Sequence, residues 1–504
     1  MDTLSLLLLL SFLWACIHFL TKSLVARKHG QGNLPPGPRP YPIIGNILQL
    51  GNKPHEAFTK LSKTYGPIMT LKLGSLTTIV MSSPDVAKEI FHTHDQVVSN
   101  RPIPDSLRAL DHHKVSMAWL PAGSTTWRNL RKVCAIQMFS KKQLDATQSM
   151  RKKKVQELLD YLQENCNSGS AVDIGQAAFT AILNSISYTL FSIDLVHYHS
   201  DTSRTFNELA HGVMEEIGSP NVADFFPVLR FFDPQGSRKR LANYFSQVLK
   251  IFDGIINDRL QARASSTKSK ESNDVLDALL DLLEEENTSE FSFTDMRHLL
   301  LDLFFGGIDS TSRTVEWAMT ELLRNPEILV KARNEIRELL GRDGIEKVAE
   351  FEITKFPYLQ AIVKETFRLH PPGPFLGPRK TETDLNILGF RVPKNAQIFA
   401  NVWAMGRDSN VWPNANSFTP ERFLGSEIDV KGRDYELIPF GAGKRICPGL
   451  PLAHRMLHLI LAALIYAFDW KLANGLKPED IDMSEIFGET LHKAEPLMII
   501  PVKV

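Results

Sequence analysis

The sequence predicts a mainly α-helical protein with small β-sheets and an N-terminal membrane anchor. Apolar residues recur at helical spacing through much of the chain, most clearly over residues 300–322. Strand-like alternation is confined to short stretches, at residues 68–82, 385–392 and 397–401. Residues 4–20 form an apolar run without a charged residue, which predicts a membrane-spanning segment at the start of the chain.

The overall composition excludes several classes of function. Lys and Arg balance Asp and Glu at 57 each, so no global charge attracts nucleic acid or an acidic partner. The four cysteines are Cys16, Cys134, Cys166 and Cys447, and no two of them form a C-x-x-C pair. Their spacing argues against a disulfide framework and against a zinc site. A reducing compartment fits this pattern best.

The apolar run at residues 4–20 is just long enough to span a bilayer as a helix. Asp2 precedes it and Lys22 follows it, so the positive-inside rule places everything after residue 22 in the cytosol. A basic start and a small-residue cleavage site are both lacking, which favours an uncleaved anchor over a signal peptide. We therefore expect an anchor at residues 1–22.

A basic, proline-rich hinge is expected at residues 23–45. The five prolines of residues 34–42 predict a stiff, extended spacer, and the alternative is an ordinary solvated linker. A single large domain should then span residues 46–504, since no repeat and no second boundary is visible. Its first elements are a predicted helix at 54–65 and a hairpin at 68–82. Residues 100–122 read as a long loop, which in a compact enzyme is usually functional or mobile.

A helix is predicted at residues 127–139, where Trp127 and Arg131 are four apart and share a face. Arg128 and Lys132 lie on the neighbouring face. Residues 150–265 are mostly helical in period, with breaks at 224–227 and 232–236 and a polar loop at 265–273.

One long helix is predicted over residues 300–322, although Gly306 and Gly307 fall inside it at a cost of about 1 kcal/mol each. The alternative is a new helix capped by Asp309 or Ser310. The apolar period continues across the glycines and no capping box is present, so the continuous helix is favoured.

Glu365 and Arg368 are three apart in a helix, and Arg422 follows within the sequence Pro-Glu-Arg-Phe. Alone, such a pair is most often a surface ion pair worth under about 1 kcal/mol. Residues 371–379 are too rich in proline for a helix and should be extended.

The densest pattern is the glycine-rich turn at residues 440–449, which contains Cys447 and leads into an apolar helix from about residue 450. We expect Pro448 as the first helical residue, which would place Cys447 at a helix N-terminus that favours a thiolate. Gly443 and Gly449 should allow the turn to fold closely around the sulfur. A cysteine before a helix is usually an inert small hydrophobe. The full pattern F-x-x-G-x-R-x-C-x-G would match by chance in on the order of one chain in ten thousand.

This pattern resembles the haem-binding loop of the cytochrome P-450 superfamily, and further motifs follow in that family's order along the whole chain. The resemblance implies the cytochrome P-450 fold and haem b, with the Cys447 thiolate as the axial iron ligand. It also implies haem contacts, listed here: Trp127, Arg131, Arg379, Phe440 and Arg445.

The resemblance implies the catalytic group as well. Asp309 and a neighbouring hydroxyl would relay protons to oxygen, but Ser310 stands where the family usually has threonine, so Ser310, Thr311 or a water could carry the relay. Glu365, Arg368 and Arg422 would form a buried network supporting the haem loop. The implied substrate pocket is Trp119, Phe304, Phe305, Phe375, Leu376 and Thr490.

The implied reaction is NADPH- and dioxygen-dependent monooxygenation of a small apolar molecule, with NADPH–cytochrome P-450 reductase as partner and the endoplasmic reticulum membrane as location. Residues 232–236, 301–304, 315–319 and 432–439 resemble the plant branch that contains geraniol 8-hydroxylases and ferruginol synthase, so a terpenoid substrate is expected. The alternatives are a phenolic or other small aromatic substrate, a reductase-independent haem-thiolate isomerase or dehydratase, and a non-catalytic haem-binding membrane protein. No nucleic-acid partner is expected.

Overall fold

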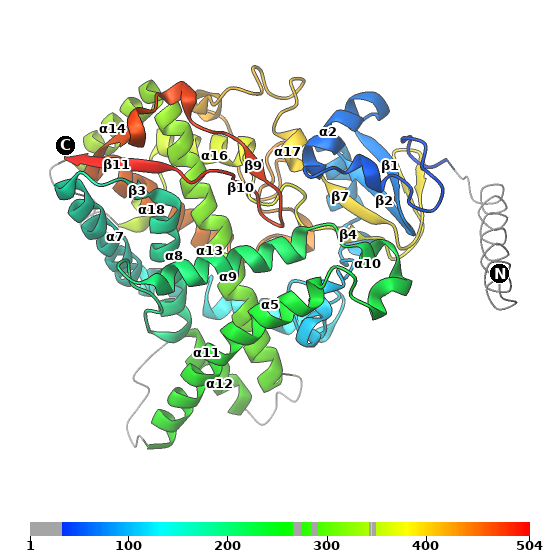
Figure 1. Ribbon diagram of the computed structural model, residues 1–504, viewed down its shortest axis with the longest axis horizontal. Coiled ribbons are helices and arrows are strands. Elements are labelled where there is room, and N and C mark those ends of the chain that lie inside the picture. Colours follow the sequence, from blue (N-terminus) through cyan, green and yellow to red (C-terminus); the bar gives the residue numbers. More distant parts are fainter. Residues whose placement is uncertain (1–32, 266–273, 285–290, 342–343, 345–348, 504) are drawn as a thin grey trace, which may run out of the picture.

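The computed structural model describes residues 33–265, 274–284, 291–341, 344 and 349–503. The predicted anchor at residues 1–22 and most of the polar loop at 265–273 lie outside this range. Helices fill the left and lower parts of the molecule in Figure 1, and a four-stranded sheet lies with α2 at the right. The α-helices are α2 (Pro54–Tyr65), α3 (Pro84–Lys88), α4 (Asp95–Val98), α5 (Thr125–Gln137), α6 (Lys141–Ala146), α7 (Gln148–Ser168), α8 (Ile174–Phe191), α9 (Asp201–Gly218), α10 (Val222–Phe225), α11 (Ser237–Ser265), α12 (Val275–Glu284), α13 (Phe293–Arg324), α14 (Pro326–Leu340), α15 (Glu350–Ile353), α16 (Pro357–Leu369), α17 (Val402–Met405) and α18 (Leu450–Ala467).

Four small sheets complete the described fold, as the sequence predicts. The largest has the order β1-β2-β7-β4, in which β1 and β2 form an antiparallel hairpin, β7 runs parallel to β2, and β4 runs antiparallel to β7. The others pair β3 and β8 with β11, β9 with β10, and β5 with β6. The strands are β1 (Ile68–Leu73), β2 (Leu76–Met81), β3 (Val172–Asp173), β4 (Arg379–Lys380), β5 (Leu385–Ile387), β6 (Phe390–Val392), β7 (Gln397–Ala400), β8 (Phe468–Leu472), β9 (Glu485–Ile486), β10 (His492–Lys493) and β11 (Met498–Lys503).

The described part of the proline-rich stretch packs against this first sheet. The Thr70 amide donates to the Pro36 carbonyl at 2.8 Å, and a Cβ added at Gly37 would lie 1.9 Å from the Thr70 carbonyl oxygen. The stretch therefore lies on β1 and does not stand free as the spacer that its composition predicts.

The helix α13 is continuous through Gly306 and Gly307, which confirms the interpretation drawn from the apolar period. It begins at a capping box formed by Ser292 and Asp295, well before the glycines. Its 32 residues give a length of about 48 Å. It packs along α8, and a Cβ added at Gly307 would lie only 3.0 Å from Ile186, so the glycine also permits this close approach.

Helix α18 lies behind the cysteine turn and packs against α13. Among the described residues it is the one helix long and apolar enough to cross a membrane, but 67% of it is buried inside the protein. It is therefore a core helix.

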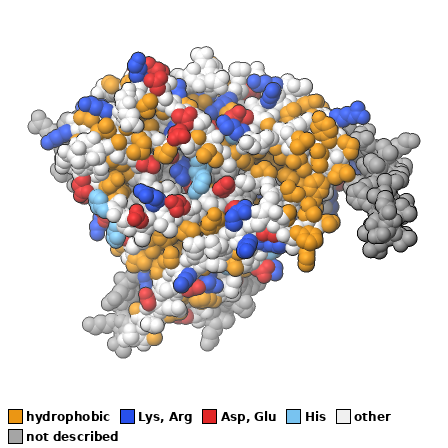
Figure 2. All heavy atoms as spheres, viewed as in Figure 1, with side chains coloured by type: hydrophobic (Ala, Val, Ile, Leu, Met, Phe, Trp, Pro, Cys, Tyr) orange, Lys and Arg blue, Asp and Glu red, His pale blue; other side chains and the backbone are white. Residues whose placement is uncertain are grey.

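An apolar surface patch covers the sheet end of the molecule, at the right of Figure 2. The Gly74 amide donates to the Ile44 carbonyl, and the Ser75 amide donates to the Phe225 carbonyl, so three separate segments meet there. The exposed large apolar side chains of these segments are Tyr41, Ile43, Leu48, Val222, Val228, Phe231 and Phe232. We call this set the apolar patch.

Residues 100–122 have little regular structure beyond the 3-10 turns at Ser106–Lys114, as predicted for a loop. The segment is nevertheless tied to α13 through Asp302. The Ser116 hydroxyl and the Met117 amide donate to the Asp302 carboxylate at 2.8 and 2.7 Å. His112 Nε2 lies 3.2 Å from Asp302 Oδ1, and His112 Nδ1 lies 2.8 Å from His298 Nδ1. We call these contacts the Asp302 tether.

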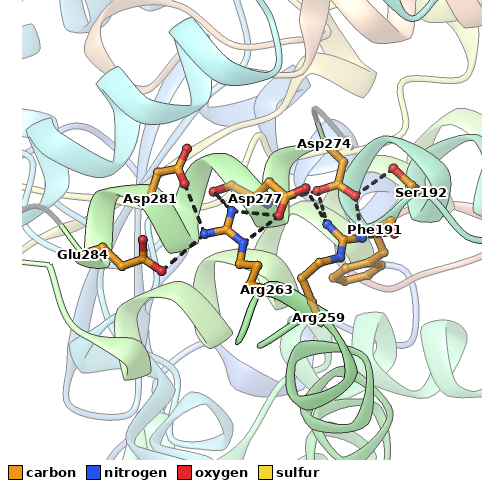
Figure 3. A network of polar contacts seen from close by, with 8 residues as sticks. All are labelled: Phe191, Ser192, Arg259, Arg263, Asp274, Asp277, Asp281 and Glu284. Carbon is orange, nitrogen blue, oxygen red and sulfur yellow. Dashed lines mark hydrogen bonds and ion pairs between the residues drawn. The ribbon is translucent and has the colours of Figure 1, made fainter. Parts of the chain in front are cut away.

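A second polar network joins α11 to α12 at the lower end of the molecule (Figure 3). Arg259 and Arg263 lie one turn apart on α11, and both donate to Asp277 of α12, each at 2.7 Å. Arg259 also donates to Asp274, which accepts from the Ser192 hydroxyl at the end of α8. The network fixes α12 against the helices that back α13.

Candidate active site

Two adjoining cavities lie between α13, α18 and the sheet. The inner cavity, of about 370 Å³, is lined by Cys447 on one side and by α13 on the other. The outer cavity, of about 510 Å³, is lined mainly by apolar residues of the sheet region and of the segment after α9. Gly377 and Glu489 line both cavities, so the two spaces meet at these residues.

The turn that carries Cys447 is closed by a hydrogen bond of 2.9 Å from the Cys447 amide to the Phe440 carbonyl. Gly443 has φ 66°, and a Cβ there would lie 2.4 Å from Asp95, so the turn requires a glycine at this position. Gly449 has φ −78° and needs no glycine, contrary to expectation. The prediction for Pro448 is also wrong. The helix α18 begins at Leu450, with Pro451 in its first turn.

The Cys447 thiol still faces the start of α18. The Cys447 side chain is exposed to the cavity but lies deep within the protein, and this desolvation raises the pKa of its thiol, whereas the amides of Gly449 and Leu450 and the charge of Arg131 oppose the shift. A metal ion at the sulfur would complete ionisation, because coordination deprotonates a thiol. Burial raises the pKa of Cys134 to about 12, and this thiol packs against Met117. Among the described cysteines, Cys447 is the one that lines the inner cavity.

Four arginines line the same cavity, and they are Arg101, Arg131, Arg379 and Arg445. Arg379 donates to the Ala442 carbonyl at 3.1 Å, while its Nε and Nη1 are buried without a hydrogen-bond partner among the described residues. Burial and the charge of Arg101 lower the pKa of Arg379 well below its usual value. Burial and the neighbouring arginines lower the pKa of Arg445 to about 9. The acidic groups are fewer, since Asp302 and Glu489 line the same cavity and Asp95 lies 4.0 Å from Arg379.

This excess of buried positive charge fits an anionic ligand with carboxylate groups, such as the haem implied by the cysteine motif. Arg131, Arg379 and Arg445 were expected here. Arg101 was not singled out from the sequence, because a single arginine in a long loop carries no local signal.

Trp127 and Phe440 also reach the inner cavity. The Trp127 indole N–H donates to the Met117 carbonyl at 3.1 Å, so it is already engaged and is not free for a haem carboxylate. Its ring lies 4.9 Å from the Arg445 guanidinium and 5.7 Å from that of Arg131. The indole ring therefore lies within cation–π distance of two guanidinium groups. Phe440 packs edge-on against Phe367 of α16 at 5.1 Å.

The α13 wall of the inner cavity includes Phe305, Ser310 and Thr311 together with the two glycines. The hydroxyls of Ser310 and Thr311 donate to the carbonyls of Gly306 and Gly307, four residues back, at 3.1 and 2.9 Å. Phe304 was predicted to lie in the pocket, but the structure does not bring it to either cavity. It is buried between Phe206 and Phe252.

Asp309 is fully buried and does not line the inner cavity. The Thr490 hydroxyl, which does line it, donates to Asp309 Oδ2 and lies 2.8 Å from His492 Nε2. Burial raises the pKa of Asp309, but His492, Arg313 and the Thr490 hydroxyl outweigh it and lower that pKa below its usual range. The carboxylate thus reaches the cavity through Thr490.

The chain of polar contacts continues away from the cavity. His492 Nδ1 lies 3.1 Å from Nδ1 of the half-buried His211 on α9. Burial lowers the pKa of His492 to about 4. Neither histidine was identified from the sequence, since 281 residues separate them.

The remaining predicted pocket residues divide between the two cavities. Trp119 and Phe375 line the outer cavity, and Leu376 lines the inner one together with Thr490. Phe375 packs against Phe58 and Phe399, with ring centroids 5.3 and 5.0 Å away.

The predicted charge network is buried beneath the cysteine turn. Arg368 makes two hydrogen bonds of 2.7 Å to the Glu365 carboxylate, and Arg422 adds a third of 3.1 Å. Glu365 and Arg368 are 0% and 1% exposed, so this is not the surface pair that two charges three residues apart usually form. The neighbouring Phe367 contacts Phe440, which links the network to the turn.

Comparison with known proteins agrees with this geometry. Residues 35–500 match the family model Cytochrome P450. The chain is 54% identical to Cytochrome P450 76T24 of Catharanthus roseus over 503 residues, which cover 100% of this chain and 99% of that protein. It is 53% identical to Cytochrome P450 76C2 of Arabidopsis thaliana over 472 residues, 93% and 92% of the two chains. It is 48% identical to Geraniol 8-hydroxylase of Catharanthus roseus over 494 residues, 98% of each chain. The chain therefore belongs to the cytochrome P450 family, within its plant 76 branch, and is a haem-thiolate monooxygenase.

Proposed function

We propose that this monooxygenase hydroxylates a small apolar terpenoid, using dioxygen and electrons that NADPH supplies through cytochrome P450 reductase. The observation that carries the proposal is the pair of adjoining cavities. One contains the Cys447 thiol and a surplus of arginines, and the other offers an apolar space of about 510 Å³. A relative at 48% identity is named Geraniol 8-hydroxylase, which supports a terpenoid over other small apolar molecules.

The residues of the inner cavity would hold the cofactor in a fixed orientation. Cys447 would ligate the iron, and Arg101, Arg379 and Arg445 would bind the two carboxylates of the haem. When bound, the haem activates dioxygen and supplies the oxidising power, which the thiolate enhances by pushing electron density toward the iron. The buried Glu365 network would keep the cysteine turn rigid beneath it.

Proton supply would come from the α13 wall. Asp309 is held as a carboxylate by its neighbours, and the Thr490 hydroxyl can pass a proton between it and a water in the inner cavity. Ser310 and Thr311 both face the same space, so each can position that water. This assignment adds Thr490 to the relay that the family pattern implies.

Apolar side chains of the outer cavity would bind the substrate and exclude water from the reaction. Phe375, Phe487 and Trp119 form part of this wall. Burying a terpenoid there removes apolar surface from water, which provides most of the binding free energy.

The protein surface suggests how the two partners meet the enzyme. Arg128, Lys132 and Lys444 are exposed, and we infer that they dock an acidic surface of the reductase. The apolar patch would rest on the endoplasmic reticulum membrane, with residues 1–22 as a single-pass anchor and the domain of residues 46–504 in the cytosol. Residues 23–45 would be the hinge between them, and its described proline-rich part is held against β1.

Reconstitution tests this function directly. The full-length protein is combined with a plant reductase in phospholipid vesicles and given a panel of terpenoids and phenols. NADPH consumption and product masses are then measured. A terpenoid product heavier by one oxygen atom, dependent on both reductase and NADPH, is expected. Turnover of phenols alone would contradict the terpenoid assignment, and reductase-free rearrangement of an oxidised lipid would favour an isomerase or dehydratase.

A further inference from the structure

Glu489 lies at the junction of the two cavities and is clamped there by its backbone. Its amide donates to the Met214 carbonyl at 3.1 Å, and the next but one amide, that of Leu491, donates to the Pro372 carbonyl at 2.8 Å. A Cβ added at Gly218, at the end of α9, would lie 1.9 Å from the Glu489 nitrogen. The backbone at Glu489 is therefore held between α9 and the segment beside the inner cavity.

The Glu489 carboxyl has no hydrogen bond and no ion pair with any described residue, although it lines both cavities. Its surroundings are largely apolar, including Phe375, Leu376 and Phe487. Burial raises the pKa of this carboxyl, and the charge of Arg101 partly opposes the shift. The Arg101 charge is the favourable interaction of this carboxyl and does not offset its burial, so the stability of the fold does not explain an acid at this position.

The cofactor does not explain Glu489. Haem carboxylates are anionic and would repel it, and the iron takes its ligand from Cys447 on the other side of the inner cavity. Arg101, the basic group whose charge acts on Glu489, is assigned to a haem carboxylate, so the group left for Glu489 to bind is the substrate.

We propose that Glu489 binds a hydroxyl group of the substrate and so selects terpenoid alcohols over terpene hydrocarbons, an inference that rests on the terpenoid function proposed above. A carboxylate accepts a strong, charge-assisted hydrogen bond from an alcohol. A protonated amine fits less well, because the positive charge of Arg101 already acts on the Glu489 carboxyl.

The test compares binding of geraniol with that of its hydrocarbon analogue 2,6-dimethylocta-2,6-diene. Dissociation constants are measured on the haem-loaded full-length protein by isothermal titration calorimetry, so the readout does not depend on turnover. The wild-type protein should bind geraniol about 10- to 100-fold more tightly than the hydrocarbon, the range expected for one hydrogen bond to a charged group. Glu489→Leu should reduce this ratio to about one without weakening hydrocarbon binding.

Two further variants serve as controls for the role of the Glu489 carboxylate. Glu489→Gln keeps the shape and one acceptor oxygen, so its ratio should fall between those of wild type and Glu489→Leu. Glu495→Leu removes an exposed acid of the same C-terminal segment and should leave the ratio unchanged. The thiolate-type spectrum of the ferrous carbon monoxide adduct verifies that each variant has folded around its haem. If Glu489→Leu does not fold, the test rests on Glu489→Gln.

The outcomes separate the two levels of the proposal. Equal ratios in wild type and in both Glu489 variants would overturn the role of Glu489 while leaving a terpenoid monooxygenase in place. Tighter binding of geranylamine than of geraniol, lost in Glu489→Leu, would show that the residue recognises a cation and would overturn the alcohol. Failure of wild type to bind either terpenoid would overturn the terpenoid function and this inference with it.

Discussion

Replacing Thr490 with valine should disconnect Asp309 from the inner cavity while preserving the shape of the wall. The Thr490 hydroxyl is the described group that joins the buried carboxylate to this space. A hydrogen bond to a charged group contributes about 1.5–3 kcal/mol. Loss of this hydrogen bond should therefore raise the pKa of Asp309, because the Thr490 hydroxyl is one of the groups that lower it.

The sign of the accompanying stability change follows from the direction of the native shift. The pKa of Asp309 is lowered in the folded protein, so this carboxylate stabilises the fold above its unfolded pKa, and that stabilisation is lost as the pH falls through the folded pKa. Raising the folded pKa by Thr490→Val should make this stabilisation smaller and complete its loss at a higher pH. Thermal unfolding of the variant between pH 3 and 7 would show this shift.

Coupling of NADPH consumption to product is the functional assay, with geraniol as the probe substrate. If Thr490 takes part in proton transfer, product formation should fall by about 10² to 10⁴ while NADPH oxidation continues and hydrogen peroxide rises. Thr320→Val is the matched control, because this buried threonine of α13 bonds only the Glu316 carbonyl and lies away from the cavity. Wild-type coupling in Thr490→Val would refute the route through Thr490.

The competing route runs through Ser310, and its variants are measured in the same assay. Ser310→Ala should uncouple the enzyme if that hydroxyl holds the proton-carrying water, and Ser310→Thr should keep or improve coupling. Thr311→Ala serves as the comparison, because Thr311 lies about 100° further round the helix. Uncoupling in Thr311→Ala with none in Ser310→Ala would move the relay by one residue.

Three further predictions concern the cofactor, the anchor and the partner. Cys447→His should abolish the red-shifted Soret band of the ferrous carbon monoxide adduct even where haem remains bound, and survival of the band would contradict thiolate ligation. Deletion of residues 1–22 should release part of the protein from the membrane fraction while haem still binds, whereas complete loss of haem under every expression condition would place that segment in the core. Reversing the charges of Arg128, Lys132 and Lys444 should slow reduction by the reductase, most strongly at low salt, and unchanged stopped-flow kinetics would exclude this docking face.

The sequence predicts well those features that depend on local pattern. The apolar period carries α13 through two glycines because packing against α8 outweighs their low helix propensity. The β1–β2 hairpin and the turn around Cys447 are likewise encoded within a few residues. The start of α18 shows the limit of such reasoning, because both Pro448 and Pro451 suit the first turn and only the structure distinguishes them.

Features that depend on distant contacts could not be predicted. Phe304 and Phe305 are adjacent on α13, and the aromatic neighbours on α9 and α11 decide which of them faces the cavity. Asp309 and Thr490 are 181 residues apart, so no local signal joins them. Arg101 and Glu489 become notable only when the fold brings their opposite charges to one enclosed space.

The Asp302 tether bears on how the substrate range of this enzyme can be altered. It joins one flank of the inner cavity to α13, and burial together with His112 lowers the pKa of His298 to about 4, so this histidine stays neutral under ordinary conditions. That flank behaves as a fixed wall, and substitutions within it risk losing the helix contact. The opposite rim of the outer cavity, at residues 217–225, carries no such anchor to α13 among its described contacts. Libraries intended to admit bulkier molecules should therefore begin at that rim.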